Sequence, residues 1–236
     1  MLKLNRVGFV QRKRSALIFA VALATMAVTS SARAVLLSDL IGFSSSINAG
    51  NLVFSDFSYL STGDMPADTK INIVPYFDGT DWGIKIQGAF HDLPGGGASD
   101  ALIEFKTSVN NPSLSITKVT LAGNPAVVGG TGVLSVVETF IPENTDDSLT
   151  IYSLVPGSSK FIDSATFSGS GYQSLHVQKD ILASSGSLGG GVPQISFITQ
   201  TYHVVPEPTS LALCGLAVLG MATPIARRAI RAKKQS

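Results

Sequence analysis

The central part of the chain is a succession of short runs in which apolar and polar residues alternate, with no long helical period. Such alternation is typical of strands that bury one face, and the clusters of Gly, Pro, Asn and Asp between the runs mark turns. Eight to ten short strands at this spacing predict an all-β domain, an antiparallel β-sandwich for which a jelly roll is one arrangement. The expected strands are 51–60, 70–77, 82–90, 101–109, 114–122, 132–140, 149–154, 160–167, 174–182 and 194–204.

Alternation also predicts which way individual side chains point. In the run 174–182, Lys179 falls on the same face as the apolar Val177 and Ile181. In the run 51–60, Phe54 and Phe57 fall on opposite faces, so we expect that strand to be buried on both faces. We also expect one short helix at residues 36–41, with Ser38 as its cap, and a hairpin turn at residues 78–81.

Charge is distributed unevenly along the chain. The sequence has 17 Lys+Arg and 16 Asp+Glu, yet residues 35–204 hold all but one of the acids, with six lysines and no arginine. An acidic body without arginine does not fit a nucleic-acid backbone. The single cysteine, Cys214, lies near the carboxyl end, so the body has neither a disulfide nor a thiolate metal site. The basic ends predict targeting segments.

The first 34 residues have the order of a secretory signal peptide. A basic stretch precedes the apolar run 16–28, and Ala32 and Ala34 form an A-x-A cleavage pattern. The apolar run is shorter than the roughly 20 residues that span a bilayer, which makes an uncleaved anchor the less favoured alternative. We expect cleavage after Ala34 and export of the body, residues 35–204.

The carboxyl-terminal segment 205–236 combines a Pro-Glu-Pro tripeptide, an apolar stretch from Leu211 to Ala226, and a basic cluster at 227–234. The apolar stretch predicts a short transmembrane helix, and the basic cluster should stay on the cytoplasmic side of the membrane. In this order, the three features resemble the PEP-CTERM sorting tail of Gram-negative bacteria. The tripeptide is Pro206-Glu207-Pro208.

This resemblance implies that exosortase, an integral-membrane protease, recognises Pro206, Glu207 and Pro208 and removes the tail; an uncleaved membrane anchor is the alternative. PEP-CTERM proteins accompany exopolysaccharide loci and biofilm formation, so the resemblance also implies a place at the cell surface or in an extracellular matrix. The body in turn resembles an uncharacterised body that recurs among PEP-CTERM proteins, and it brings no catalytic residues with it. The stretches that carry this second resemblance are 54–57, 177–180 and 196–202.

Candidate catalytic and metal-binding residues are few. His91, His176 and His203 have no metal-site spacing, and the G-x-S-x-G motif of many hydrolases is absent. Two acidic clusters offer oxygen ligands for calcium, but neither matches the twelve-residue calcium loop, and solvated turns are the simpler interpretation. We therefore predict no catalytic residue, no cofactor and no metal. The acidic clusters are Asp78/Asp81 and Glu143/Asp146/Asp147.

Exposed aromatic side chains can stack on sugar rings, and Tyr76 and Trp82 lie beside the acidic turn 78–81. The competing interpretation places Trp82 in the core, because large aromatic residues dominate small β cores. Taken together, the sequence predicts an exported, non-enzymatic, matrix-associated β-sandwich that would bind exopolysaccharide. The alternative is a secreted hydrolase that acts on matrix polysaccharide or esters.

Overall fold

The computed structural model describes residues 33–42, 45–141, 148–186 and 190–207. The signal peptide as far as Ala32, the second acidic cluster (Glu143/Asp146/Asp147), Pro208 and the apolar stretch 211–226 lie outside these residues. Within the described part of the chain, no helix is both long and apolar enough to cross a membrane.

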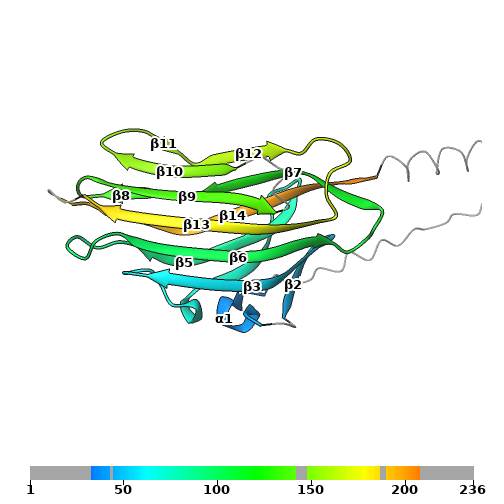
Figure 1. The fold of residues 1–236 in the computed structure, drawn as a ribbon, viewed down its shortest axis with the longest axis horizontal. Coiled ribbons are helices and arrows are strands. Elements are labelled where there is room, and N and C mark those ends of the chain that lie inside the picture. Colours follow the sequence, from blue (N-terminus) through cyan, green and yellow to red (C-terminus); the bar gives the residue numbers. More distant parts are fainter. Residues whose placement is uncertain (1–32, 43–44, 142–147, 187–189, 208–236) are drawn as a thin grey trace, which may run out of the picture. The chain divides into compact units, whose positions relative to one another are not determined.

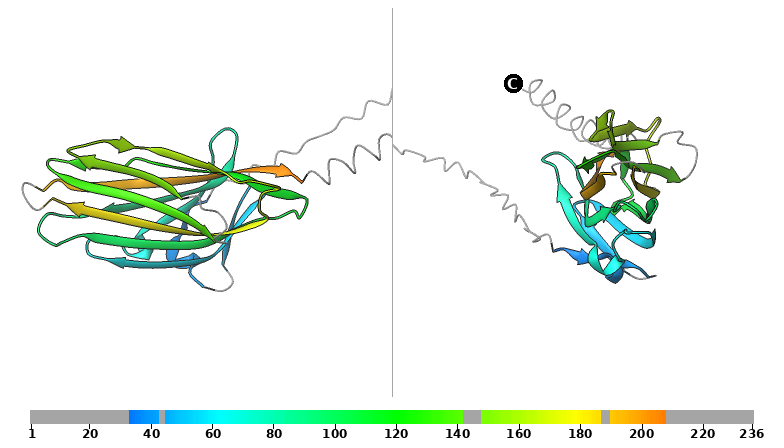
Figure 2. Two further views of the ribbon diagram at one scale, coloured as in Figure 1. Left: turned by 45° about the horizontal axis from the view of Figure 1, so that its top comes forward. Right: turned by 90° about the vertical axis from the view of Figure 1, so that its left-hand side faces the viewer.

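The described residues form two antiparallel sheets that face each other (Figure 1 and Figure 2). In spatial order, sheet I contains β1 (Val35–Leu36), β4 (Asn72–Phe77), β5 (Trp82–His91), β14 (Val192–Pro206), β7 (Leu114–Gly123) and β12 (Ile162–Thr166), with β8 (Ala126–Val128) paired to β14. Sheet II contains β11 (Ser159–Lys160), β10 (Leu149–Val155), β9 (Gly132–Ile141), β13 (Ser174–Ser185), β6 (Ser99–Val109), β3 (Leu52–Thr62) and β2 (Ser46–Ala49). The predicted antiparallel β-sandwich is confirmed.

Each expected strand is present within a few residues of its predicted ends, and the run 160–167 is divided between β11 and β12. The inner faces of both sheets carry the apolar members of the alternating runs, such as Ile84 and Ile86 on β5 and Val177 and Ile181 on β13. Burying these side chains between two sheets is the usual way in which a sandwich forms its core. The short strands β1, β2 and β8 were not expected.

The expected helix is α1 (Leu37–Leu40), which contacts β3 and is drawn below it in Figure 1. Its first turn follows Leu36, and no side chain caps it, so the prediction that Ser38 is the cap is wrong. Leu37 and Leu40 are buried, and packing of these two side chains against the sandwich holds the turn in place.

Strand β3 is buried on one face, not on both as expected. Asp56 adopts a positive φ of 55°, and the pairing register with β6 shifts between Ser55 and Ser58. This bulge inserts an extra residue into the alternation, so Phe54 and Phe57 both point into the core. There they lie 6.0 and 5.4 Å from the ring of Phe105 on β6.

Candidate functional site

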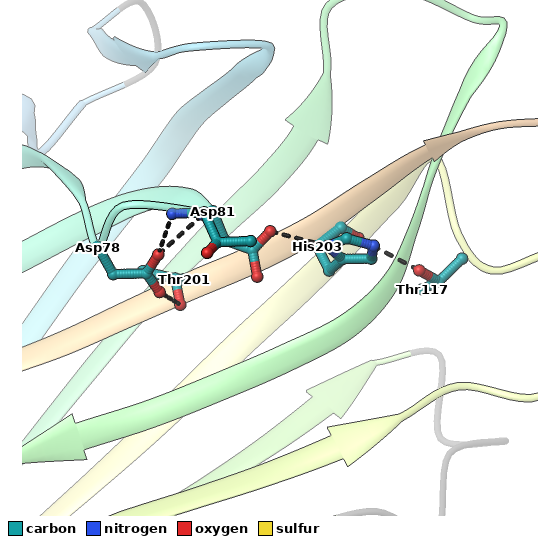
Figure 3. A network of polar contacts seen from close by, with 6 residues as sticks. Asp78, Asp81, Thr117, Thr201 and His203 are labelled. Carbon is teal, nitrogen blue, oxygen red and sulfur yellow. Dashed lines mark hydrogen bonds and ion pairs between the residues drawn. The ribbon is translucent and has the colours of Figure 1, made fainter.

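The turn between β4 and β5 carries the polar network of Figure 3. The Oδ1 atom of Asp78 accepts hydrogen bonds from the backbone N–H groups of Thr80 and Asp81, at 2.9 and 2.8 Å. Its Oδ2 atom accepts a hydrogen bond from the Thr201 hydroxyl on β14, at 3.1 Å. Partial burial acts to raise the pKa of Asp78, but these hydrogen bonds outweigh it and hold the pKa below its ordinary value. Asp78 therefore fixes the turn on β14, as the solvated-turn interpretation predicts.

Asp81 reaches the imidazole of His203, the next outward-pointing residue of β14 (Figure 3). The register pairs Tyr202 with Trp82, so His203 follows at the level of the turn. Its Nδ1 atom lies 2.8 Å from Asp81 Oδ1, and the side chains are 46% and 17% exposed respectively. The His203 backbone carbonyl also accepts a hydrogen bond from the Thr117 hydroxyl of β7, at 3.4 Å. The network thus joins three strands of sheet I.

Trp82 forms an exposed aromatic pair with Phe77 at the end of the β4–β5 ladder. Their ring centroids are 4.8 Å apart, and the two residues are 40% and 46% exposed. In the alternation of β5, Trp82 falls on the same face as Ile84, which points into the core. Trp82 is the first residue of the strand, however, and it is exposed, so the interpretation that places it in the core is wrong. The indole lies against Gly50, where an added Cβ would come within 2.4 Å of the ring, so only glycine fits there.

These side chains surround a hollow of about 180 Å³. It offers an aromatic ring, a carboxylate, an imidazole, an amide and a hydroxyl within one small volume, which is the mixture by which pockets orient a polar ligand. Tyr76 is not part of it: its ring lies 5.7 Å from the ammonium of Lys85, which also lies 4.6 Å from the ring of Phe197. The hollow is lined by Asn51, Leu52, Thr80, Asp81, Trp82, Tyr202, His203 and Val204.

The other two histidines lie apart from this hollow. His91 Nδ1 is 2.8 Å from the backbone oxygen of Ala89, and the residue lines a separate hollow of about 200 Å³ with Asn124 and Ser196. His176 is half-buried on β13 and alternates with the buried residues Leu175 and Val177, so it faces away from the core. In the described part of the chain, no three His, Cys, Asp or Glu residues are grouped to hold a metal ion.

Two residues of the Pro-Glu-Pro tripeptide, Pro206 and Glu207, are described, and both contact the body. Pro206 ends β14, and the backbone N–H of Glu207 donates to the carbonyl of Ser113, at 2.8 Å. The Glu207 carboxylate accepts hydrogen bonds from Gln173 Nε2 at 2.8 Å and from the Ser115 hydroxyl at 3.4 Å. At the other end, Ala34 of the expected signal-peptide cleavage site is exposed and directly precedes β1.

Asp81 and His203 provide two members of an acid–base triad. A hydrolase of that type needs a nucleophile within hydrogen-bond reach of the imidazole. No hydroxyl or thiol of the residues described here donates to the His203 ring, whose hydrogen-bond partner is Asp81. The contact with Asp81 therefore fixes the orientation of the His203 imidazole. Sequence reasoning placed Trp82 beside the acidic turn that contains Asp81, but it did not connect His203 with either residue.

No protein-family model matches the chain. No curated protein sequence matches it. Among solved structures, it is similar to the enzymatically active domain of tailspike protein 4 from bacteriophage CBA120, with 11% identity, a TM-score of 0.28, and coverage of 63% of this chain and 20% of that one. It is also similar to TmCBM61, solved in complex with β-1,4-galactotriose, with 8% identity, a TM-score of 0.31, and coverage of 61% and 88%. The chain thus spans a fifth of the tailspike chain, and both likenesses are too distant to bear on function.

Proposed function

We propose that the protein is an exported, non-enzymatic β-sandwich that binds a neutral polysaccharide at the cell surface or in the surrounding matrix. The observation that supports this proposal is that Trp82, Asp81 and His203 line the same hollow. A sugar ring has an apolar face of C–H groups and a rim of hydroxyls. An exposed indole fits the first. A carboxylate, which accepts hydrogen bonds, and an imidazole, which can accept or donate them, fit the second.

The charge of the body favours a neutral glycan over an acidic one. Residues 35–204 contain 15 acids and six lysines, and two of these acids, Asp78 and Asp81, lie at the candidate site. An anionic polymer would meet a negative potential as it approached, which lowers association rates and affinity. The size of the hollow fits contact with one or two sugar units, with longer chains extending over the neighbouring surface of sheet I.

Export and processing belong to the same proposal. The signal peptide 1–34 would deliver the body across the membrane, and Leu211–Ala226 would hold it there until exosortase removes the tail at Pro206-Glu207-Pro208. Support comes from the order of these segments in the sequence and from the position of Glu207 at the end of β14, where the tail leaves the sandwich. Processing would then leave the sandwich outside the cell.

Binding to a panel of neutral and acidic polysaccharides, measured by affinity electrophoresis and calorimetry on the processed protein, tests the proposal. We expect Trp82→Ala and Asp81→Ala to weaken binding of a neutral glycan at least tenfold, the loss of about 1.4 kcal/mol expected for a central contact. Phe161→Ala is the matched control, because it removes another exposed aromatic ring that does not line the hollow. This variant should bind the glycan with the affinity of the wild type. Equal affinities for all three variants would refute the site.

The same samples test the alternative of a secreted hydrolase, which the Asp81–His203 pair favours. Release of reducing ends or of ester-linked acids by the wild type, with loss of that release in His203→Ala, would establish an enzyme in place of a binding protein. We expect no release from any substrate that the protein binds.

A further inference from the structure

The sandwich core encloses a polar cluster that the proposed function does not use. Lys179 on β13 and Glu138 on β9 are paired directly across the ladder of sheet II, and both side chains are completely buried. Gln200 reaches them from β14 in the opposite sheet. One Glu138 oxygen accepts a hydrogen bond from Lys179 Nζ and the other accepts one from Gln200 Nε2. A single carboxyl group thus contacts both an amine and an amide, one through each of its oxygens.

The surroundings of this cluster are apolar and aromatic. The ammonium of Lys179 lies 5.9 Å from the ring of Phe105, and the ring of Tyr202 packs 5.8 Å from that of Phe54. Gln200 Oε1 and the Tyr202 hydroxyl are buried and have no hydrogen-bond partner among the described residues. Buried polar groups that lack a partner are rare and call for an explanation, and apolar surroundings of this kind strengthen electrostatic interactions between the groups inside them.

Burial shifts the protonation of both charged groups toward the neutral forms. It raises the pKa of Glu138, although Lys179 and Gln200 act in the opposite direction. Burial likewise lowers the pKa of Lys179, although Glu138 opposes that shift. The pair therefore has access to an uncharged amine next to a carboxylic acid. A neutral amine is a nucleophile, and a carboxylic acid can pass a proton to a leaving group.

We propose that the folded protein joins Lys179 to Gln200 by an intramolecular amide bond, with Glu138 as the catalytic residue that transfers protons. The lone pair of Lys179 Nζ attacks the Cδ carbon of Gln200 and forms a new C–N bond. The bond from Cδ to Nε2 then breaks, and that nitrogen takes its electron pair. Glu138 gives its proton to the departing nitrogen and receives one from Nζ, so it ends as it began. The products are one secondary amide and one molecule of ammonia, and no oxidant or reductant is consumed.

The placement of the three groups supports Gln200 as the acceptor. Its leaving nitrogen is already hydrogen-bonded to the carboxyl group that would protonate it. Its carbonyl oxygen has no hydrogen-bond partner among the described residues, so no other side chain there holds the amide away from Lys179. Positioning of this kind replaces an encounter in solution, and exclusion of water removes hydrolysis as a competing reaction. The bond would connect β13 of sheet II to β14 of sheet I, a covalent link between the sheets in a body without cysteine.

Mass spectrometry of the full chain, purified from its native host without chemical treatment, tests this proposal. We expect an intact mass about 17 Da below that calculated from the N- and C-terminal residues found by peptide mapping, which is the mass of the one ammonia molecule lost in the substitution. Trypsin cleaves after unmodified lysine, so Lys179 should remain uncleaved. After further digestion with chymotrypsin, fragments containing Lys179 and Gln200 should appear as one branched species. An unchanged mass with cleavage after Lys179 would overturn the proposal, and a loss of about 18 Da with Glu138 in the link would overturn the assignment to Gln200.

Variants separate the chemistry from folding. Glu138→Gln keeps the size of the side chain and removes the transferable proton. We therefore expect no loss of ammonia in this variant, although Lys179 and Gln200 are both present. Lys106→Met, which replaces an exposed lysine on the neighbouring strand β6, is the matched control and should retain the lower mass. The wild-type mass decides the question even if Glu138→Gln does not fold. The outcome is independent of polysaccharide binding.

Discussion

Asp92 provides a quantitative test of how the ends of the sandwich are held together. It follows β5 and is almost completely buried, and its carboxylate accepts hydrogen bonds from the Ser99 hydroxyl at 2.6 Å and from the Ser185 backbone N–H at 2.7 Å. Ser99 in turn accepts the backbone N–H of Asp64, at 2.9 Å. Hydrogen bonds to a charged group contribute about 1.5–3 kcal/mol each. Because Asp92→Ala removes two of them, we expect it to lower the free energy of unfolding by about 3–5 kcal/mol.

The pH dependence of this loss of stability shows whether the ionised Asp92 carboxylate is its cause. Burial acts to raise the pKa of Asp92, but the hydrogen bonds from Ser99 and Ser185 outweigh it and lower the pKa. A carboxyl group with a lowered folded-state pKa stabilises the fold above its unfolded value of about 3.9, and this contribution disappears as the pH falls through the folded-state value. The difference between wild type and Asp92→Ala should therefore be full at pH 7 and shrink below about pH 4.

Urea unfolding followed by the fluorescence of Trp82, the one tryptophan of the chain, measures this difference at each pH. Asp39→Ala is the matched control, because it removes the same charge from an exposed position and should change stability by less than about 0.5 kcal/mol. The reasoning fails if Asp92→Ala costs no more than the control at pH 7. It also fails if the loss is the same at pH 7 and well below pH 4.

Two further changes test the core and the carboxyl-terminal contact. Phe54→Ala empties a completely buried site between Phe105 and Tyr202 and should cost about 3–5 kcal/mol in the same urea assay; a loss below about 1 kcal/mol would contradict the packing described. Gln173→Ala removes a hydrogen bond to the Glu207 carboxylate, so the proposed tail removal should become faster in a pulse–chase experiment in the native host, and an unchanged rate would show that this contact does not limit processing.

The strands could be predicted because their apolar residues recur at every second position, which is a local property of the sequence. Their pairing is not local. Strand β14 lies between β5 and β7, and the sequence of residues 192–206 does not indicate that these two strands pair with it. The bulge at Asp56 was missed for a similar reason. A positive φ is uncommon for residues other than glycine, so the aspartate at position 56 does not by itself indicate a bulge. Only the register with β6 shows the bulge and explains why Phe54 and Phe57 both point into the core.

The candidate site was predictable in part. Trp82 and Asp81 are neighbours in one hairpin, so the sequence alone placed an aromatic ring beside an acid. His203 is 122 residues away from Asp81, and only the fold brings the two together. The buried cluster left a clearer signal. Alternation put Lys179 on an apolar face, and the same rule puts Glu138 on the face of Val136 and Phe140. Two opposite charges at apolar positions are a specific sign of a buried pair, because an isolated buried charge is too costly.

Strand β14 connects the features that the proposals depend on. Because its side chains alternate, Gln200 and Tyr202 point into the core while Thr201 and His203 point to the turn of β4 and β5, and Glu207 follows at its end. A force applied at Glu207 would therefore enter the sandwich through this strand and through the contacts of Glu207 with Ser113, Ser115 and Gln173. An amide bond at Gln200 would pass that force to β13 before it reached the rest of β14. It would also limit movement of His203, three residues away, and so keep the hollow in its binding geometry under load.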